Sequence, residues 1–170
     1  SALSGDTTGD RSTAIGFQAL AVQNFTTNTD TYNTAVGYNA GVAVTTATDN
    51  TIIGGLAGDA ATTAAGLTLL GKSAGSAITT GGDNTGLGKQ ALENTTTGTS
   101  NTAVGKDALE ANTTASNNTA VGFKALEANT TGTPNVAVGA NALDANTTGG
   151  SNVAVGFESL TANTTGNFNI

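Results

Sequence analysis

The chain has 170 residues, a net charge of −7, 24 Gly, 4% aromatic residues and no Trp, Met, Cys or His. Because large side chains are few, they cannot fill a deep globular core. Any core must therefore be thin and built from Ala, Val, Ile and Leu. The lack of Cys excludes a disulfide scaffold, and no apolar run reaches the roughly 18 residues that predict a membrane span. The basic residues are spread along the chain, whereas nucleic-acid binding needs a clustered basic face. They are Arg11, Lys72, Lys89, Lys106 and Lys124.

One unit recurs from the N-terminus onward: a short strand-like run ends on a glycine, and a polar turn follows. It is clearest at residues 118–134, NTAVGFKALEANTTGTP, which is followed at 135–151 by NVAVGANALDANTTGGS. After a first interval of 21 residues, these glycines are always 17 residues apart, and this strict period predicts a solenoid. The glycine column is Gly16, Gly37, Gly54, Gly71, Gly88, Gly105, Gly122, Gly139 and Gly156.

The first interval contains four extra residues within 21–32, AVQNFTTNTDTY. We predict that they form a loop that bulges from one coil and holds Phe25 and Tyr32. The repeat pattern covers Ala2 to Ile170, so residues 1–170 are expected to be a single repeat array of about ten coils. We expect this array to be a fragment of a longer fibre.

Each coil is expected to hold one firm strand, such as residues 118–121. A weaker strand or turn is expected at paired threonines, such as Thr130 and Thr131, because β-branched residues suit extended backbone. Helical repeats need about 33 residues or more, so a helical solenoid is excluded. The sequence therefore predicts an all-β fold, a parallel β-solenoid of the β-roll type.

Two neighbouring columns of the strand must face opposite sides of the sheet. The column directly before the glycine is apolar in every coil, and we predict that it faces a continuous dry core. This valine column is Ile15, Val36, Ile53, Leu70, Leu87, Val104, Val121, Val138 and Val155. The column one residue earlier is mostly small and is predicted to face outward, where further chains could pack closely against it. This alanine column is Ala14, Ala35, Ile52, Leu69, Gly86, Ala103, Ala120, Ala137 and Ala154.

Two further columns describe the rest of the coil. The asparagine column lies four residues before the glycine and predicts a ladder of stacked amides, interrupted at Leu67. It consists of Asn33, Asn50, Asn84, Asn101, Asn118, Asn135, Asn152 and Asn169. The leucine column lies four residues after the glycine, and glycine replaces leucine in the middle coils, so packing should differ there. It consists of Leu20, Gly41, Gly58, Gly75, Leu92, Leu109, Leu126, Leu143 and Leu160.

Catalytic chemistry is not indicated, because the chain has no His or Cys and no base beside its serines. We therefore expect no enzyme and no cofactor. Carboxylates recur five residues after the glycine, as Asp59, Glu93, Glu110, Glu127 and Asp144. This carboxylate column could hold Ca²⁺, which prefers several oxygen ligands, or form a solvated face that Lys72, Lys89 and Lys106 partly neutralise. The GGxGxD motif of calcium-binding β-rolls is absent, which favours the solvated face, and no metal site is assigned.

Two other surface features have alternative interpretations. Asn-x-Thr triplets are acceptor patterns for N-glycosylation, but Asn-Thr-Thr-Gly is also ordinary turn chemistry, which we favour. The triplets begin at Asn24, Asn94, Asn112, Asn117, Asn129, Asn146 and Asn163. Aromatic residues directly after the glycine could stack on sugars or pack against a neighbouring chain, and we favour packing. They are Phe17, Tyr38, Phe123 and Phe157.

The motif NTAVG-x-x-AL-x-x-NTTG-x-x-N resembles the repeats of phage tail-fibre shafts. It is also similar to the β-roll heads of trimeric autotransporter adhesins, whose repeats end their strands on a comparable Val-Ala-Ile-Gly sequence. The resemblance extends from Ala2 to Ile170. It implies a parallel homotrimer, left-handed coils and a location at a cell or virion surface.

These features predict a structural shaft segment of an extracellular or virion fibre that spaces a receptor-binding tip from its base. The expected partners are copies of the same chain, as a homotrimer or homopolymer, with any glycan or receptor bound outside these residues. One alternative is an adhesin module whose lateral face binds glycans or a cell surface. Another is a self-assembling extracellular filament.

Overall fold

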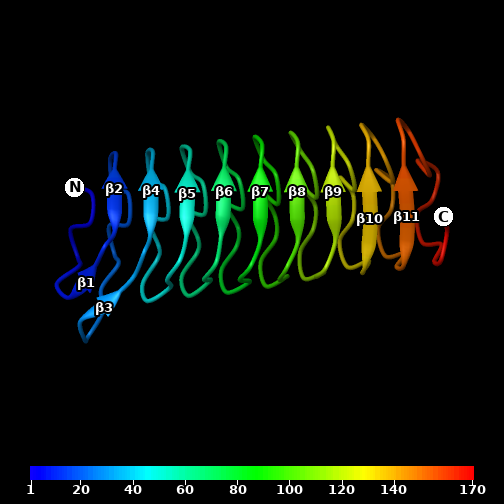
Figure 1. The fold of residues 1–170 in the computed structure, drawn as a ribbon. Helices are drawn as coiled ribbons and strands as arrows, with labels where there is room; N and C mark the ends of the chain where they lie inside the picture. Colours follow the sequence, from blue (N-terminus) through cyan, green and yellow to red (C-terminus); the bar gives the residue numbers. More distant parts are fainter.

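The computed structural model describes residues 1–170 and contains strands and turns but no helix. Figure 1 shows the strands of the main sheet side by side, one in each turn of the chain, from β2 near the N-terminus to β11 near the C-terminus. This sheet has nine parallel strands, and each pairs with the strand of the next coil. The strands are β2 Thr13–Ile15, β4 Thr34–Val36, β5 Thr51–Ile53, β6 Thr68–Leu70, β7 Thr85–Leu87, β8 Thr102–Val104, β9 Thr119–Val121, β10 Asn135–Val138 and β11 Asn152–Val155. The predicted parallel β-solenoid is confirmed, with about nine turns rather than ten.

A second, smaller sheet lies beside the main sheet at the N-terminal end (Figure 1). It consists of two parallel strands, β1 Gly9–Asp10 and β3 Thr29–Asp30. The insertion at 21–32 is therefore partly a strand and not only a loop. Its Phe25 is 7% exposed, whereas Tyr32 is 52% exposed.

The glycine column ends every strand for a conformational reason. Its residues have φ between +124° and +146°, a region that side chains with a Cβ rarely adopt. A Cβ at Gly105 would also overlap the backbone carbonyl group of Gly122 in the next coil. The strand therefore ends where only glycine permits both the turn and the stacking of coils.

The segment after each glycine consists of overlapping turns. In one coil, the Ala125 N–H donates to the Gly122 carbonyl at 3.3 Å, and the Asn129 N–H donates to the Leu126 carbonyl at 3.1 Å. Of the two structures expected at the paired threonines, the turn is confirmed and the weaker strand does not form. The Thr130 N–H and hydroxyl instead both donate to the carbonyl of the equivalent threonine of the next coil, at 2.9 and 3.0 Å. The hydroxyl competes with the backbone N–H for the carbonyl that would accept a strand hydrogen bond, so this segment is a turn.

The predicted orientation of the strands is wrong. Ala103, Ala120 and Ala137 of the alanine column are fully buried. The valine column faces outward, with Leu70 50% and Val155 67% exposed. The physical reason is the narrow cross-section of the solenoid: the leucine column already fills the interior, so most strands have room only for a small residue opposite it.

Two buried clusters make up the interior, one built from residues 19–78 and one from residues 91–154. In the first cluster, three positions of the leucine column are glycine: Gly41, Gly58 and Gly75. The side chains of Ile52 and Leu69, from the alanine column, fill the space beside them. A Cβ at Gly58 would lie 3.0 Å from Leu69 Cδ1 and 3.2 Å from Ile52 Cδ1. The expected difference in packing of the middle coils is confirmed, and its cause is an exchange of volume between the two columns.

The predicted asparagine ladder is confirmed. The Asn135 N–H donates to Asn118 Oδ1 at 2.8 Å, and Asn118 Nδ2 donates to the Gly132 carbonyl at 3.0 Å. The same pattern recurs in the other coils and stops at Leu67, whose N–H donates to Asn50 Oδ1 but whose side chain has no amide to continue the ladder. Each buried amide thus connects two coils, which satisfies polar groups that would otherwise be costly to bury.

No long apolar helix of a kind that crosses a bilayer is present.

Candidate functional site on the outer face of the main sheet

The outer face of the main sheet carries two parallel rows of side chains. One is the valine column, which is half-buried to exposed along its whole length. The other lies two residues earlier on the same face, because side chains alternate along a strand. It is threonine in most coils and becomes Val136 and Val153, both 37% exposed, in β10 and β11.

This face is uncharged, because neither row contains a titratable side chain, and its valine column is apolar. Strands about 4.8 Å apart extend nine apolar residues over about 40 Å along the sheet. Contiguous exposed apolar surfaces of this kind mark interaction sites in soluble proteins. The outer face can therefore bury its apolar column against another surface.

One margin of the outer face carries the residues directly after the glycine column. Phe17 and Tyr38 stack with ring centroids 5.6 Å apart and planes 8° apart. Further along, Phe123 lies between two ammonium groups, with Lys106 Nζ 5.3 Å and Lys124 Nζ 5.7 Å from its ring centroid. The predicted aromatic positions are thus exposed, and the rings contact one another or lysines within the chain.

The carboxylate column lies beyond this margin, in the turns. Lys124 Nζ donates to Glu127 Oε1 at 2.7 Å, and Gln90 Nε2 donates to Glu93 Oε2 at 2.7 Å. Of the three lysines expected to neutralise the column, only Lys106 forms an ion pair, and its partner lies outside the column. Burial raises the pKa of Asp59. Burial also raises the pKa of Glu110, and nearby carboxylates add to the effect.

The partner of Lys106 is Asp107, which was not recognised from the sequence. Lys106 Nζ donates to Asp107 Oδ2 at 2.6 Å, and Asp107 is only 4% exposed. The equivalent position two residues after the glycine is Gln90 in the preceding coil and Lys124 in the following one. Because the acid occurs there without forming a column, a search for recurring residues does not find it.

The candidate glycosylation residues separate into two groups. Asn112, Asn129 and Asn146 are fully buried and form a second asparagine column, in which Asn146 Nδ2 donates to Asn129 Oδ1 at 2.9 Å. Asn163 extends this ladder to Asn146 at 3.2 Å. A glycan on these side chains would require them to leave the ladder, so the turn interpretation fits them. Asn24, Asn94 and Asn117 are exposed.

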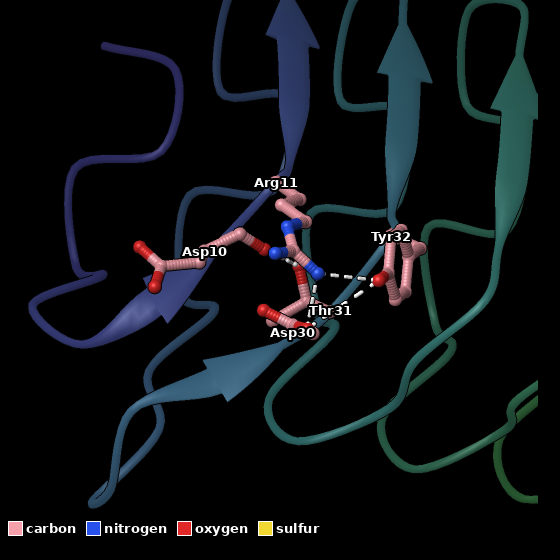
Figure 2. Close-up of polar contacts among 5 residues, drawn as sticks. All are labelled: Asp10, Arg11, Asp30, Thr31 and Tyr32. Carbon is pink, nitrogen blue, oxygen red and sulfur yellow. Dashed lines mark hydrogen bonds and ion pairs between the residues drawn. The ribbon is translucent and has the colours of Figure 1, made fainter.

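A polar cluster connects the small sheet to the first coils, as Figure 2 shows. Arg11 Nη1 donates to Asp30 Oδ2 and to the Tyr32 hydroxyl, and the guanidinium lies 5.4 Å from the Tyr32 ring centroid. The hydrogen bond that Arg11 donates to Tyr32 and the charge of Asp30 raise the pKa of Arg11. The Thr31 hydroxyl donates to the Asp10 carbonyl at 2.8 Å. These exposed contacts fix the small sheet and form no pocket.

Comparison with protein-family models, with curated protein sequences and with solved structures finds no match to this chain. No family is therefore shown, and the fold itself is the β-solenoid described above. The outer face of the main sheet, with its uncharged apolar column, is the surface feature common to all the strand-bearing coils.

Proposed function

We propose that this chain is a structural shaft segment of an extracellular or virion fibre, in which three copies pack along the outer faces of their main sheets. The observation that carries the proposal is the exposed valine column, with Ile15 59% and Leu70 50% exposed. A single chain leaves these side chains in water, and burial gains about 25 cal/mol per Å² of apolar surface. Association along the rod removes this surface from water over its whole length.

A second copy of the chain is the occupant that this face favours. The apolar side chains recur once per coil, every 17 residues beyond the first interval. A surface with the same spacing can match every one of them, and another copy of the array has that spacing. The net charge of −7 does not oppose this packing directly, because the outer face itself carries no charge. The resemblance of the repeat to those of trimeric fibres supports the number three and the extracellular or virion location.

The proposed role is a spacer that holds a receptor-binding tip away from its base. A stack of similar coils provides length and stiffness without depending on any single side chain. Recognition of a target then belongs to other parts of the fibre.

Sedimentation tests the association, with substitutions on the two faces of β9. The 170-residue chain is expected to sediment at three times its mass of 16.4 kDa. Val121→Asp, on the outer face, should give a folded monomer, whereas Ala120→Asp, at a fully buried position, should prevent folding. Thr131→Asp, at an exposed turn of the same coil, is the control and should remain trimeric. A monomeric wild type that unfolds cooperatively would remove the trimer, as would a trimer that tolerates Val121→Asp.

A lateral binding module is the second candidate, favoured by the exposed stacked pair Phe17 and Tyr38, which are 59% and 56% exposed. Exposed aromatic faces are suited to stacking on sugar rings. A pull-down of the purified array against glycans and whole cells distinguishes the two candidates. The spacer predicts no saturable binding. Sugar-competed binding that is lost in the Phe17→Ala/Tyr38→Ala variant would establish the binding module instead.

A further inference from the structure

The turns around Asp107 break a pattern that holds in the two neighbouring coils. There, the residue two after the glycine donates a hydrogen bond to the carboxylate five after it: Gln90 to Glu93 and Lys124 to Glu127, each at 2.7 Å. In the coil between them, both positions are acids, Asp107 and Glu110. The donor that balances the carboxylate in the neighbouring coils is therefore replaced by a second negative charge.

Asp107 is the buried member of this group and is only half satisfied. Its Oδ2 accepts from Lys106 Nζ at 2.6 Å, but its Oδ1 is buried and has no hydrogen-bond partner. The side chain is 6% exposed. A buried carboxylate oxygen without a partner is costly, and native structures normally satisfy such an atom with a donor, a water or an ion.

The distances between the carboxylates fit a common ion. One oxygen from each of Asp107, Glu110 and Glu127 lies within 4.8 Å of the other two. Two oxygens on opposite sides of one Ca²⁺ ion are about 4.6–5.2 Å apart, because each Ca–O distance is about 2.3–2.6 Å. The corresponding separation for Mg²⁺ is about 4.0–4.2 Å. The three carboxylates are therefore near enough to share one Ca²⁺ ion, whereas Mg²⁺ is less suited because it demands near-ideal octahedral geometry and dehydrates reluctantly.

The local charge also favours a divalent cation. Asp107, Glu110 and Glu127, together with the adjoining Glu93, carry four negative charges, and Lys106 and Lys124 carry two positive ones. The remaining charge of −2 equals that neutralised by one Ca²⁺ ion. The lysine side chains are 49% and 35% exposed, so either ammonium can move into water when an ion binds.

We propose that Asp107, Glu110 and Glu127 bind one Ca²⁺ ion, which joins two consecutive coils of the solenoid. Water supplies the remaining ligands, since Ca²⁺ takes six to eight oxygens. With three protein carboxylates, we expect a dissociation constant of about 10⁻⁴ to 10⁻³ M, the range of extracellular calcium modules. This inference is independent of the proposed trimer and of the fibre role.

Calorimetric titration of the purified 170-residue chain with CaCl₂ tests the site, together with thermal unfolding at matched CaCl₂ and MgCl₂ concentrations. One Ca²⁺ should bind per chain and raise the melting temperature, and Mg²⁺ should have a smaller effect. Asp107→Asn and Glu110→Gln should each abolish the Ca²⁺ response. Asn tolerates the positive φ of Asp107, 59°, so the first variant should fold.

Asp144→Asn is the matched control, because Asp144 belongs to the carboxylate column but lies outside the cluster. This variant should bind Ca²⁺ like the wild type. Absence of binding heat, equal stabilisation by the two cations, or a Ca²⁺ response that survives Asp107→Asn would each overturn the proposal.

Discussion

The coils that contain β5 and β6 and the coils that contain β8, β9 and β10 share one backbone path but fill it differently. In the first group, Ile52 and Leu69 project inward from the strand and face glycines of the leucine column. In the second group, the strand supplies alanine, and leucine projects from the opposite turn. The interior volume is thus conserved across the coil, although the residues that provide it are exchanged.

The same exchange changes the polarity of a third position, seven residues after the glycine. In the first group this position is apolar, as in Ala61 and Ile78. In the second it becomes the second asparagine column, represented by Asn129 and Asn146. The N-terminal coils therefore depend more on apolar packing, and the C-terminal coils add a second hydrogen-bonded ladder. The difference shows that a solenoid repeat is specified by the total side-chain volume of facing positions, and not by one fixed residue at each position.

The largest expected change in stability comes from creating a cavity in the core of the first group. Ile52→Ala gives β5 the strand residue of the second group but leaves Gly41 and Gly58 opposite it. We expect a loss of about 3 kcal/mol in unfolding free energy, typical of large-to-small substitutions in a core. Urea unfolding of the wild type and the variant measures it.

The compensated variant Ile52→Ala/Gly58→Leu is the control, because it restores the arrangement of the second group. Gly58 has φ +51°, close to the 52° of Leu126, so leucine can adopt this backbone. The double variant should recover most of the lost stability. If it is no more stable than Ile52→Ala alone, volume is not exchanged between the two columns as described.

A smaller effect is expected in the second group from removing one amide of its additional ladder. Asn129 Nδ2 donates to the Gly132 carbonyl at 3.0 Å, and its Oδ1 accepts from Asn146. Asn129→Ala should cost about 2 kcal/mol, because it leaves buried polar groups unsatisfied. Amide hydrogen exchange should show the added opening in coils 112–163. Alanine already occupies the equivalent position in the first group, at Ala61. Wild-type stability of Asn129→Ala would therefore remove the distinction between the two groups.

The smallest effect concerns pH. Burial, with the charges of Asp107, Glu93 and Glu127, raises the pKa of Glu110 in the folded chain above its ordinary value of 4.5. The folded state therefore binds the proton more tightly than the unfolded state. The stabilisation by protonated Glu110 is fully present below pH 4.5 and is lost as pH rises through the raised pKa.

In calcium-free buffer, Glu110→Gln should therefore be more stable than the wild type at pH 7, and the difference should shrink toward pH 4.5. Its size should stay below about 1 kcal/mol, because solvent screens the charge. Urea midpoints at several pH values measure it. Asp59→Asn, in the first group, should show a pH dependence of the same sign, since burial raises the pKa of Asp59 as well. A difference for Glu110→Gln that is constant with pH would contradict the assignment.

The period, the parallel strands and the asparagine ladder could be predicted from the sequence, because each depends on a residue type that recurs in nearly every coil. The strand orientation could not be predicted by asking which column is always apolar. Val121 is apolar although it lies on the outer face, and Ala120 is small because Leu126 lies within the same core. The informative signal was the exchange between Ile52 and Gly58, since only facing positions compensate in volume.

The candidate cation site was only partly accessible to sequence reasoning. Glu110 and Glu127 belong to a visible column, and Ca²⁺ was one of its two interpretations. Asp107 supplies the buried oxygen, but a position that is an acid in one coil and Gln90 or Lys124 in its neighbours has no column to identify it. Its proximity to Glu127 depends on the turn geometry, which the repeat length alone does not determine.

The distribution of the backbone hydrogen bonds has a mechanical consequence. Of 100 such bonds, only 19 lie within the strands, so the turns supply much of the contact between neighbouring coils. Tension applied to the two ends of one chain would load these bonds along their own direction, a few at a time, beginning at the terminal coil. Each detached coil releases 17 residues, or roughly 55–60 Å of extended chain. A single solenoid under tension would therefore lengthen in equal steps and act as an extensible tether, whereas lateral packing of several chains would make it a rigid strut.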